Sequence, residues 1–218
     1  MKLNPADYKN IIFDFGGVII NLDYELTTQA FKRLGIDDFS SLFSKAKQNN
    51  LFDDYEKGVI SSDKLRSELK KVLPPSTTNE QIDDAWNAML LDLPNERLEL
   101  LLKFKDTHQT YLLSNTNEIH INTFHSQLRK MHNEENLNNY FDKVYFSYKI
   151  GMRKPDAEIF EFVLNENNLI AEETLFIDDS IQHIEAANKL NINTHHLEVE
   201  RESLSLIHIS EPTRHRYI

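Results

Sequence analysis

The chain has 218 residues, of which 40% are hydrophobic, and this predicts one main globular domain with a smaller attachment. Its formal net charge is -11 and it has no block of basic residues, which excludes nucleic acid and anionic membranes as main partners. The absence of cysteine excludes disulfides, thiolate metal sites and a cysteine nucleophile. Because no apolar run has the length of a membrane span or a signal peptide core, we expect a cytoplasmic protein. The sequence does not distinguish a monomer from a dimer.

Short apolar segments alternate with longer helical patterns along the chain. The expected strands are Ile11–Phe15, Thr110–Leu113, Lys143–Ser147, Thr174–Ile177 and Thr194–Leu197. Helices are expected at Asn95–Lys105, Ile121–His132, Asp156–Glu166 and Ile181–Lys189. Buried strands separated by helices predict an α/β fold with a Rossmann-like, parallel, five-stranded core sheet that is covered on both faces.

About ninety residues separate the first two expected strands, which is far more than one crossover helix needs. Amphipathic patterns in this stretch predict helices at Tyr24–Leu34, Phe39–Lys47, Ser61–Leu73 and Asn79–Leu90. We therefore expect a core domain formed by residues 1–20 and 95–203, with an inserted α-helical cap domain at residues 21–94.

Residues 204–214 have the sequence LSLIHISEPTR, which is the codon-by-codon translation of a common transposase sequencing adapter. We interpret residues 204–218 as an artefact tail derived from this adapter and leave them out of the fold prediction. We also expect the native C-terminal sequence to be missing.

Polar residues follow the expected strands. Asp14 lies at the carboxyl end of the first strand, before Gly16 and Gly17; the others are Ser114 and Asn115 after the second, Lys154 after the third, and Asp178 and Asp179 after the fourth. Each residue taken alone could cap a turn or lie on the surface. Because the carboxyl ends of parallel strands share one edge of the sheet, however, their common position there favours a functional site.

The segments FDFGGVI, LLSNTN, GMRKP and FIDDS, in this order, resemble the motifs of haloacid dehalogenase-like hydrolases, and specifically of the phosphatases with a helical cap. The resemblance covers about residues 10 to 198 and is closest to the branch that includes a bacterial α-glucose-1-phosphate phosphatase. It implies a Mg²⁺-dependent phosphatase that acts on a small phosphorylated substrate, in which Asp14 forms an aspartyl-phosphate that water later hydrolyses. The implied ligands of Mg²⁺ are Asp14, the Gly16 carbonyl, Asp178 and Asp179, and the implied phosphate-binding groups are Ser114, the Asn115 backbone and Lys154.

Gly16 departs from the family pattern, because these phosphatases usually carry a second aspartate there as the general acid and base. Loss of such a group typically costs about 10²–10⁴ in rate. An anomeric hydroxyl is a better leaving group than an ordinary alcohol, so we expect a sugar phosphate such as a sugar 1-phosphate. Asp23 is a candidate substitute acid, although its position favours a role at a helix start.

Other functions remain as alternatives. A haloacid dehalogenase also lacks the second aspartate, but Gly16-Gly17 and Asp178-Asp179 favour a metal-dependent phosphatase. A mutase is disfavoured because it must move phosphoryl groups both ways. A weakened phosphosugar-binding module is disfavoured because the nucleophile, lysine and serine are all present. In the cap, the acidic segment 53–56 before Gly58 could contact substrate hydroxyls, whereas Trp86 is typical of cap-core packing.

Overall fold

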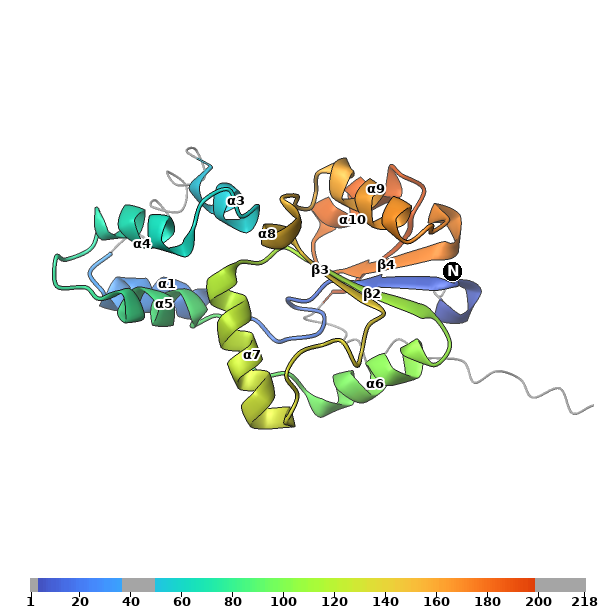
Figure 1. The fold of residues 1–218 in the computed structure, drawn as a ribbon, viewed down its shortest axis with the longest axis horizontal. Coiled ribbons are helices and arrows are strands. Elements are labelled where there is room, and N and C mark those ends of the chain that lie inside the picture. The colour runs from blue at the N-terminus through green and yellow to red at the C-terminus, as the bar shows by residue number, and fades with distance from the viewer. Residues whose placement is uncertain (1–3, 37–49, 199–218) are drawn as a thin grey trace, which may run out of the picture.

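The computed structural model describes residues 4–36 and 50–198, and its centre is a parallel five-stranded sheet (Figure 1). The strands are β1 Asn10–Phe13, β2 Gln109–Ser114, β3 Lys143–Phe146, β4 Thr174–Asp178 and β5 Asn193–His196. They lie in the order β3-β2-β1-β4-β5, and every neighbouring pair is parallel. The predicted α/β fold class is confirmed, and each expected strand overlaps an observed one.

Helices cover both faces of the sheet (Figure 1). One face packs against α6 Asn95–Lys105 and α7 Glu118–His132, and the other against α9 Ala157–Glu166 and α10 Ile181–Asn188. In β1, Ile11 and Phe13 face the first layer while Ile12 faces the second, as the two-residue period of a strand requires. All three are fully buried, which explains why β1 reads as a continuous apolar run.

The described helices between β1 and α6 lie beyond one end of the sheet, at the left of Figure 1. They are α1 Tyr24–Arg33, α3 Leu51–Glu56, α4 Ser62–Lys70 and α5 Asn79–Asn87. Their apolar cluster includes Phe31, Leu65 and Trp86 and also Ile119 of α7, and it is separate from the two clusters that pack on the sheet. The predicted helix Phe39–Lys47 falls outside the described residues, and the proposed limits of the cap at 21–94 stay a prediction.

Two paired segments join these helices to the sheet. Leu22 and Leu90 form an antiparallel bridge, and the Asn21 carbonyl accepts a hydrogen bond of 3.0 Å from Leu91 N. This pairing explains why α5 ends at Asn87, before the predicted Leu90. Asp23 is the N-cap of α1 and accepts a bond of 2.9 Å from Glu25 N, in agreement with its predicted place at a helix start.

Shorter elements complete the described chain: the 3₁₀ segments Pro5–Asp7 and Ala171–Glu173, and the four-residue helix α8 Ser147–Ile150. Among residues 4–36 and 50–198, no helix is both long and apolar enough to cross a membrane. The tail at 204–218 lies outside the described residues, and its interpretation stays a prediction.

Candidate active site

The loop after β1 brings Asp14 to the carboxyl edge of the sheet. The Asp14 backbone N–H donates to the Ile177 carbonyl at 2.8 Å, which ties this loop to β4. Gly17 has φ +73°, and a Cβ there would lie 2.3 Å from Asp179 Oδ2. A Cβ on Gly16 would lie 2.6 Å from Leu22 Cδ1. The bare turn behind Asp14 therefore admits the Asp179 carboxylate on one side and the Leu22 side chain on the other.

Lys154 joins two of the predicted carboxylates. Its side chain is fully buried, and its Nζ lies 2.6 Å from Asp14 Oδ1 and 2.6 Å from Asp178 Oδ2. A buried ammonium requires such partners, because an unpaired charge in the interior is costly. The structure thus brings together three residues that come from the loop after β1, the segment after α8 and the end of β4.

Asn115 fixes the backbone of Lys154. The Asn115 side chain accepts a bond of 2.9 Å from Lys154 N and donates one of 2.8 Å to the Lys154 carbonyl. This positioning contact was not predicted, since the sequence pointed only to the Asn115 backbone as a phosphate ligand. Ser114, also predicted to bind phosphate, is buried beside it at the end of β2, and its hydroxyl donates to the Asn115 carbonyl at 3.4 Å.

Asp14, Asp178 and Asp179 can each offer an oxygen such that these three atoms lie within 4.8 Å of one another. Three carboxylates against the single ammonium of Lys154 leave an excess of negative charge. A divalent cation balances such a site, and clustered carboxylate oxygens are the ligands that Mg²⁺ prefers. The donor set therefore fits the predicted Mg²⁺.

The two carboxylates that share Lys154 differ in their pKa. Burial, with the nearby Asp178 charge, raises the pKa of Asp14 to about 7 although Lys154 opposes the shift. Burial also acts to raise the pKa of Asp178, but Lys154 and His183 outweigh it and lower that pKa to about 2. Lys154 and His183 thus stabilise the charged form of Asp178, whereas the charge of Asp14 needs further compensation.

Sequence reasoning did not find His183. Its Nδ1 lies 3.0 Å from both Asp178 oxygens, and Ser180 N donates to Asp178 Oδ1 at 2.7 Å. His183 lies in the first turn of α10, five residues after Asp178. The sequence did carry a signal for this contact. Asp178 ends a strand, and the first turn of the helix that follows folds back over the strand end, so a histidine in that turn can reach the carboxylate.

A cavity of about 100 Å³ opens beside the carboxyl edge of β1 and β2. On the side of the sheet it is lined by Phe15, Gly16, Ile20, Ser114, Asn115, Thr116, His120, Ile121 and Phe124. On the opposite side, the lining comes from α1, from α3 and from the paired segments that join these helices to the sheet: Leu22, Tyr24, Glu56, Met89 and Leu90. It is therefore a small chamber with a largely apolar wall, adjacent to the predicted phosphate-binding residues.

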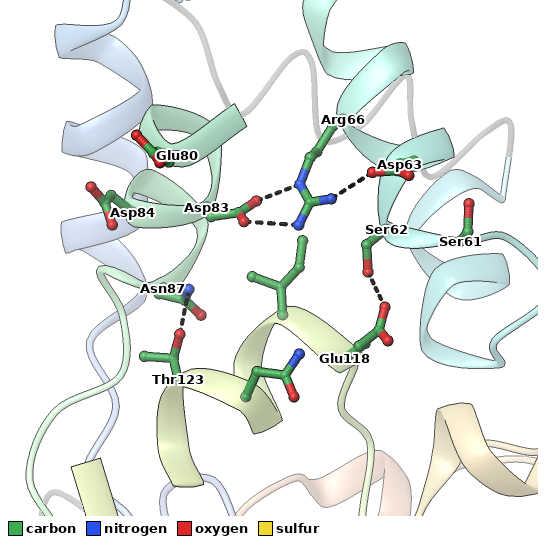
Figure 2. A pocket seen from close by; sticks show the side chains of 12 residues that line it. Ser61, Ser62, Asp63, Arg66, Glu80, Asp83, Asp84, Asn87, Glu118 and Thr123 are labelled. Carbon is green, nitrogen blue, oxygen red and sulfur yellow. Dashed lines mark hydrogen bonds and ion pairs between the residues drawn. The ribbon is translucent and has the colours of Figure 1, made fainter. Parts of the chain in front are cut away.

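Figure 2 shows a larger, open pocket of about 530 Å³ between α4, α5 and α7. Its cation, Arg66, is held by both oxygens of Asp83 at 2.8 Å and by Asp63 at 2.8 Å. Further carboxylates, among them Glu80 and Glu118, line the same pocket. Because this lining would repel a phosphate, the smaller chamber near Asp14 is the better candidate for the active site.

The sequence profile of the family described as haloacid dehalogenase-like hydrolase matches residues 11–196. The chain belongs to this family. A D-ribitol-5-phosphate phosphatase from Bacteroides thetaiotaomicron is 34% identical over 186 residues, which are 85% of this chain and 90% of that protein. The sesquiterpene phosphatase astK from Aspergillus oryzae is 30% identical over 192 residues, which are 87% of this chain and 90% of that protein.

Solved structures of the family superpose on most of the chain. A haloacid dehalogenase family enzyme from Bacteroides thetaiotaomicron, in a complex with magnesium and inorganic phosphate, has a TM-score of 0.78 and 36% identity, and 87% of this chain and 93% of that one are covered. A family hydrolase from Porphyromonas gingivalis also has a TM-score of 0.78, with 31% identity and coverage of 87% and 91%. The predicted family and fold class are confirmed by these comparisons.

Proposed function

We propose that this chain is a Mg²⁺-dependent phosphatase that hydrolyses a small sugar or sugar-alcohol phosphate. The observation that carries this proposal is the convergence of Asp14, Lys154, Asp178 and Asp179 at one sheet edge. The enzyme class agrees with two phosphatases that the chain matches along most of its length. The predicted cytoplasmic location and the oligomeric state stay open.

Asp14 is the nucleophile in this proposal. One of its oxygens bonds to phosphorus while the ester bond breaks, and water then hydrolyses the aspartyl-phosphate. Lys154, fixed by Asn115, stabilises negative charge on the transferring group, and Ser114 with the Asn115 backbone binds phosphoryl oxygens.

Asp14, Asp178, Asp179 and the Gly16 carbonyl would hold Mg²⁺, which neutralises charge on the phosphoryl oxygens when it is bound. A family structure in complex with magnesium and inorganic phosphate supports the choice of this ion. A metal bound there also compensates the charge of Asp14, which the metal-free site leaves with a raised pKa.

The size of the chamber and one relative support the substrate class. The chamber holds only about 100 Å³, so it suits a small leaving group. The D-ribitol-5-phosphate phosphatase is named for an ester of a small polyol. The finer prediction of a sugar 1-phosphate depends on the missing carboxyl at Gly16 and is tested by comparing anomeric with primary esters.

The test is phosphate release from glucose 1-phosphate, glucose 6-phosphate, D-ribitol 5-phosphate and 4-nitrophenyl phosphate, with Mg²⁺ or with EDTA. We expect Mg²⁺-dependent release by the wild type and only background release by Asp14→Asn. The control is Asp106→Asn, which makes the same change at the exposed C-cap of α6 and should retain activity. Metal-independent release, or an active Asp14→Asn variant, would exclude the proposal.

A further inference from the structure

An apolar side chain lies beside Gly16, where the family usually carries a carboxyl group. Leu22 Cδ1 stands 2.6 Å from the position that a Cβ on Gly16 would take. The acid that the family usually carries at this position is therefore replaced by part of the chamber wall. A phosphatase that acts on an ordinary alcohol ester still needs a proton donor, so the donor must come from another side of the chamber.

Three titratable side chains line the chamber: Tyr24, Glu56 and His120. Burial, with the nearby charges of Asp179 and Asp14, raises the pKa of Tyr24 to about 12, so this phenol is poorly matched to acid catalysis near neutral pH. His120 Nδ1 lies 2.9 Å from Asn87 Oδ1, so its proton is used in that bond. Burial lowers the pKa of His120 to about 3, which leaves the ring neutral and its other nitrogen an acceptor.

Glu56 has the placement that a proton donor needs. It lies at the end of α3, and Arg153 holds its Oε2 at 2.9 Å through Nε and Nη2. That contact holds the side chain through one oxygen, and Glu56 is among the residues that line the chamber. Arg153 directly precedes Lys154, so the same loop positions both groups.

We propose that Glu56 donates the proton that the leaving oxygen needs, in place of the carboxyl that Gly16 lacks. The charged groups around it are Asp53 and Lys154 in addition to Arg153. Burial raises the pKa of Glu56, although Arg153 opposes the shift, and a raised pKa favours a proton donor near neutral pH. This proposal depends on the phosphatase function proposed above.

The proton balance closes over one turnover. As an Asp14 oxygen bonds to phosphorus, the bond from phosphorus to the ester oxygen breaks, and that oxygen takes the Glu56 proton and leaves as a neutral alcohol. The Glu56 carboxylate then accepts a proton from the water that attacks the phosphorus of the aspartyl-phosphate. Inorganic phosphate leaves, Asp14 is regenerated and Glu56 is protonated again.

The test compares Glu56→Gln with wild type on an alkyl ester, D-ribitol 5-phosphate, and an aryl ester, 4-nitrophenyl phosphate. An alkoxide needs a proton as it leaves, whereas nitrophenolate does not. We expect kcat/KM for the alkyl ester to fall by about 10²-fold or more, and that for the aryl ester to change only a few-fold. The alkaline limb of the pH profile for the alkyl ester should disappear as well.

Glu161→Gln is the matched control. Glu161 is exposed on α9 and does not line the chamber, so this variant makes the same change of side chain away from the site. It should leave the ratio of alkyl to aryl activity unchanged. If Glu56→Gln leaves this ratio and the pH profile unchanged, the role of Glu56 is overturned and the phosphatase function stands. If the wild type hydrolyses neither ester, both proposals are overturned.

Discussion

Gly17 is the residue at which backbone conformation and the metal site meet. Its φ of +73° favours glycine, and a side chain there would collide with Asp179 Oδ2. We expect Gly17→Ala to destabilise the protein by about 1–2 kcal/mol through backbone strain alone. Displacement of Asp179 should also weaken Mg²⁺ activation, which a Mg²⁺ titration of activity measures.

Gly151→Ala separates these two effects. Gly151 has φ +75°, but a Cβ there would meet nothing within 4 Å. This variant should lose similar stability in thermal unfolding while its Mg²⁺ dependence stays at the wild-type value. If both variants shift the Mg²⁺ dependence equally, the contact between Gly17 and Asp179 does not determine metal binding.

The raised pKa of Asp14 predicts that, when EDTA removes Mg²⁺, the free energy of unfolding depends on pH. Because the pKa rises from 3.8 to about 7 on folding, the native state binds a proton that the unfolded chain has lost, and stability falls as pH rises between these values. Each pKa unit corresponds to about 1.4 kcal/mol. In EDTA, Asp14→Asn should therefore become progressively more stable than wild type from pH 5 to pH 8, as thermal unfolding can measure. A difference that does not vary with pH would contradict this explanation.

The residues with chemical roles in the proposal were found from sequence where they lie at the carboxyl ends of strands or in the segments that follow them. Asp14, Ser114, Lys154 and Asp178 are examples, because a parallel sheet places all strand ends at one edge. His183 and the pair of Arg153 with Glu56 were not found, since these contacts depend on how a helix turn and the inserted helices pack. Sequence position alone does not encode that packing.

At the scale of elements, every described helix of eight or more residues was predicted, although several of their ends differ. The prediction of Asn95–Lys105 agrees with the observed α6. The short helices α3 and α8 were not predicted, because six and four residues carry too little periodicity. The helix α5 was predicted too long, since Leu90 forms a bridge with Leu22 rather than continuing the helix.

Trp86 holds several elements together. It stacks on Phe52 of α3 with a ring-centroid distance of 5.0 Å and on His120 of α7 at 5.5 Å, and its side chain is buried. We expect Trp86→Ala to cost about 3–5 kcal/mol in denaturant unfolding followed by circular dichroism.

Trp86→Phe should cost clearly less, because the indole N–H has no hydrogen-bond partner among residues 4–36 and 50–198. Leu102→Ala, at a side chain that is 45% exposed on α6, is the control and should change stability little. If Trp86→Ala lowers the free energy of unfolding only slightly, this stacking does not support the packing of α3 and α5 against α7.

At the scale of the whole molecule, the helices inserted between β1 and β2 close one side of a chamber whose other side is the sheet edge. Their presence was predictable from the long separation of the first two strands. The residues that face the chamber could not be predicted, because they depend on how the segments around Leu22 and Leu90 pair.

The interpretation of residues 204–218 is also tested at this scale. Strand β5 ends at His196, and Leu197 N bonds to the Asp178 carbonyl at 3.0 Å, so these contacts precede the tail. Deletion of residues 204–218 should leave the thermal midpoint and Mg²⁺-dependent activity unchanged. A large loss of stability would mean that the tail contributes to the fold.

The most direct test of the account is to trap the phosphorylated aspartate. Wild type is quenched during turnover of 4-nitrophenyl phosphate with Mg²⁺, reduced with borohydride and digested, and the peptides are analysed by mass spectrometry. Borohydride reduces an acyl phosphate to an alcohol, so the account predicts that the peptide containing Asp14 carries homoserine at that position. Phosphate release without modification of Asp14, or with modification of another carboxylate, would contradict the assignment of Asp14 as the nucleophile.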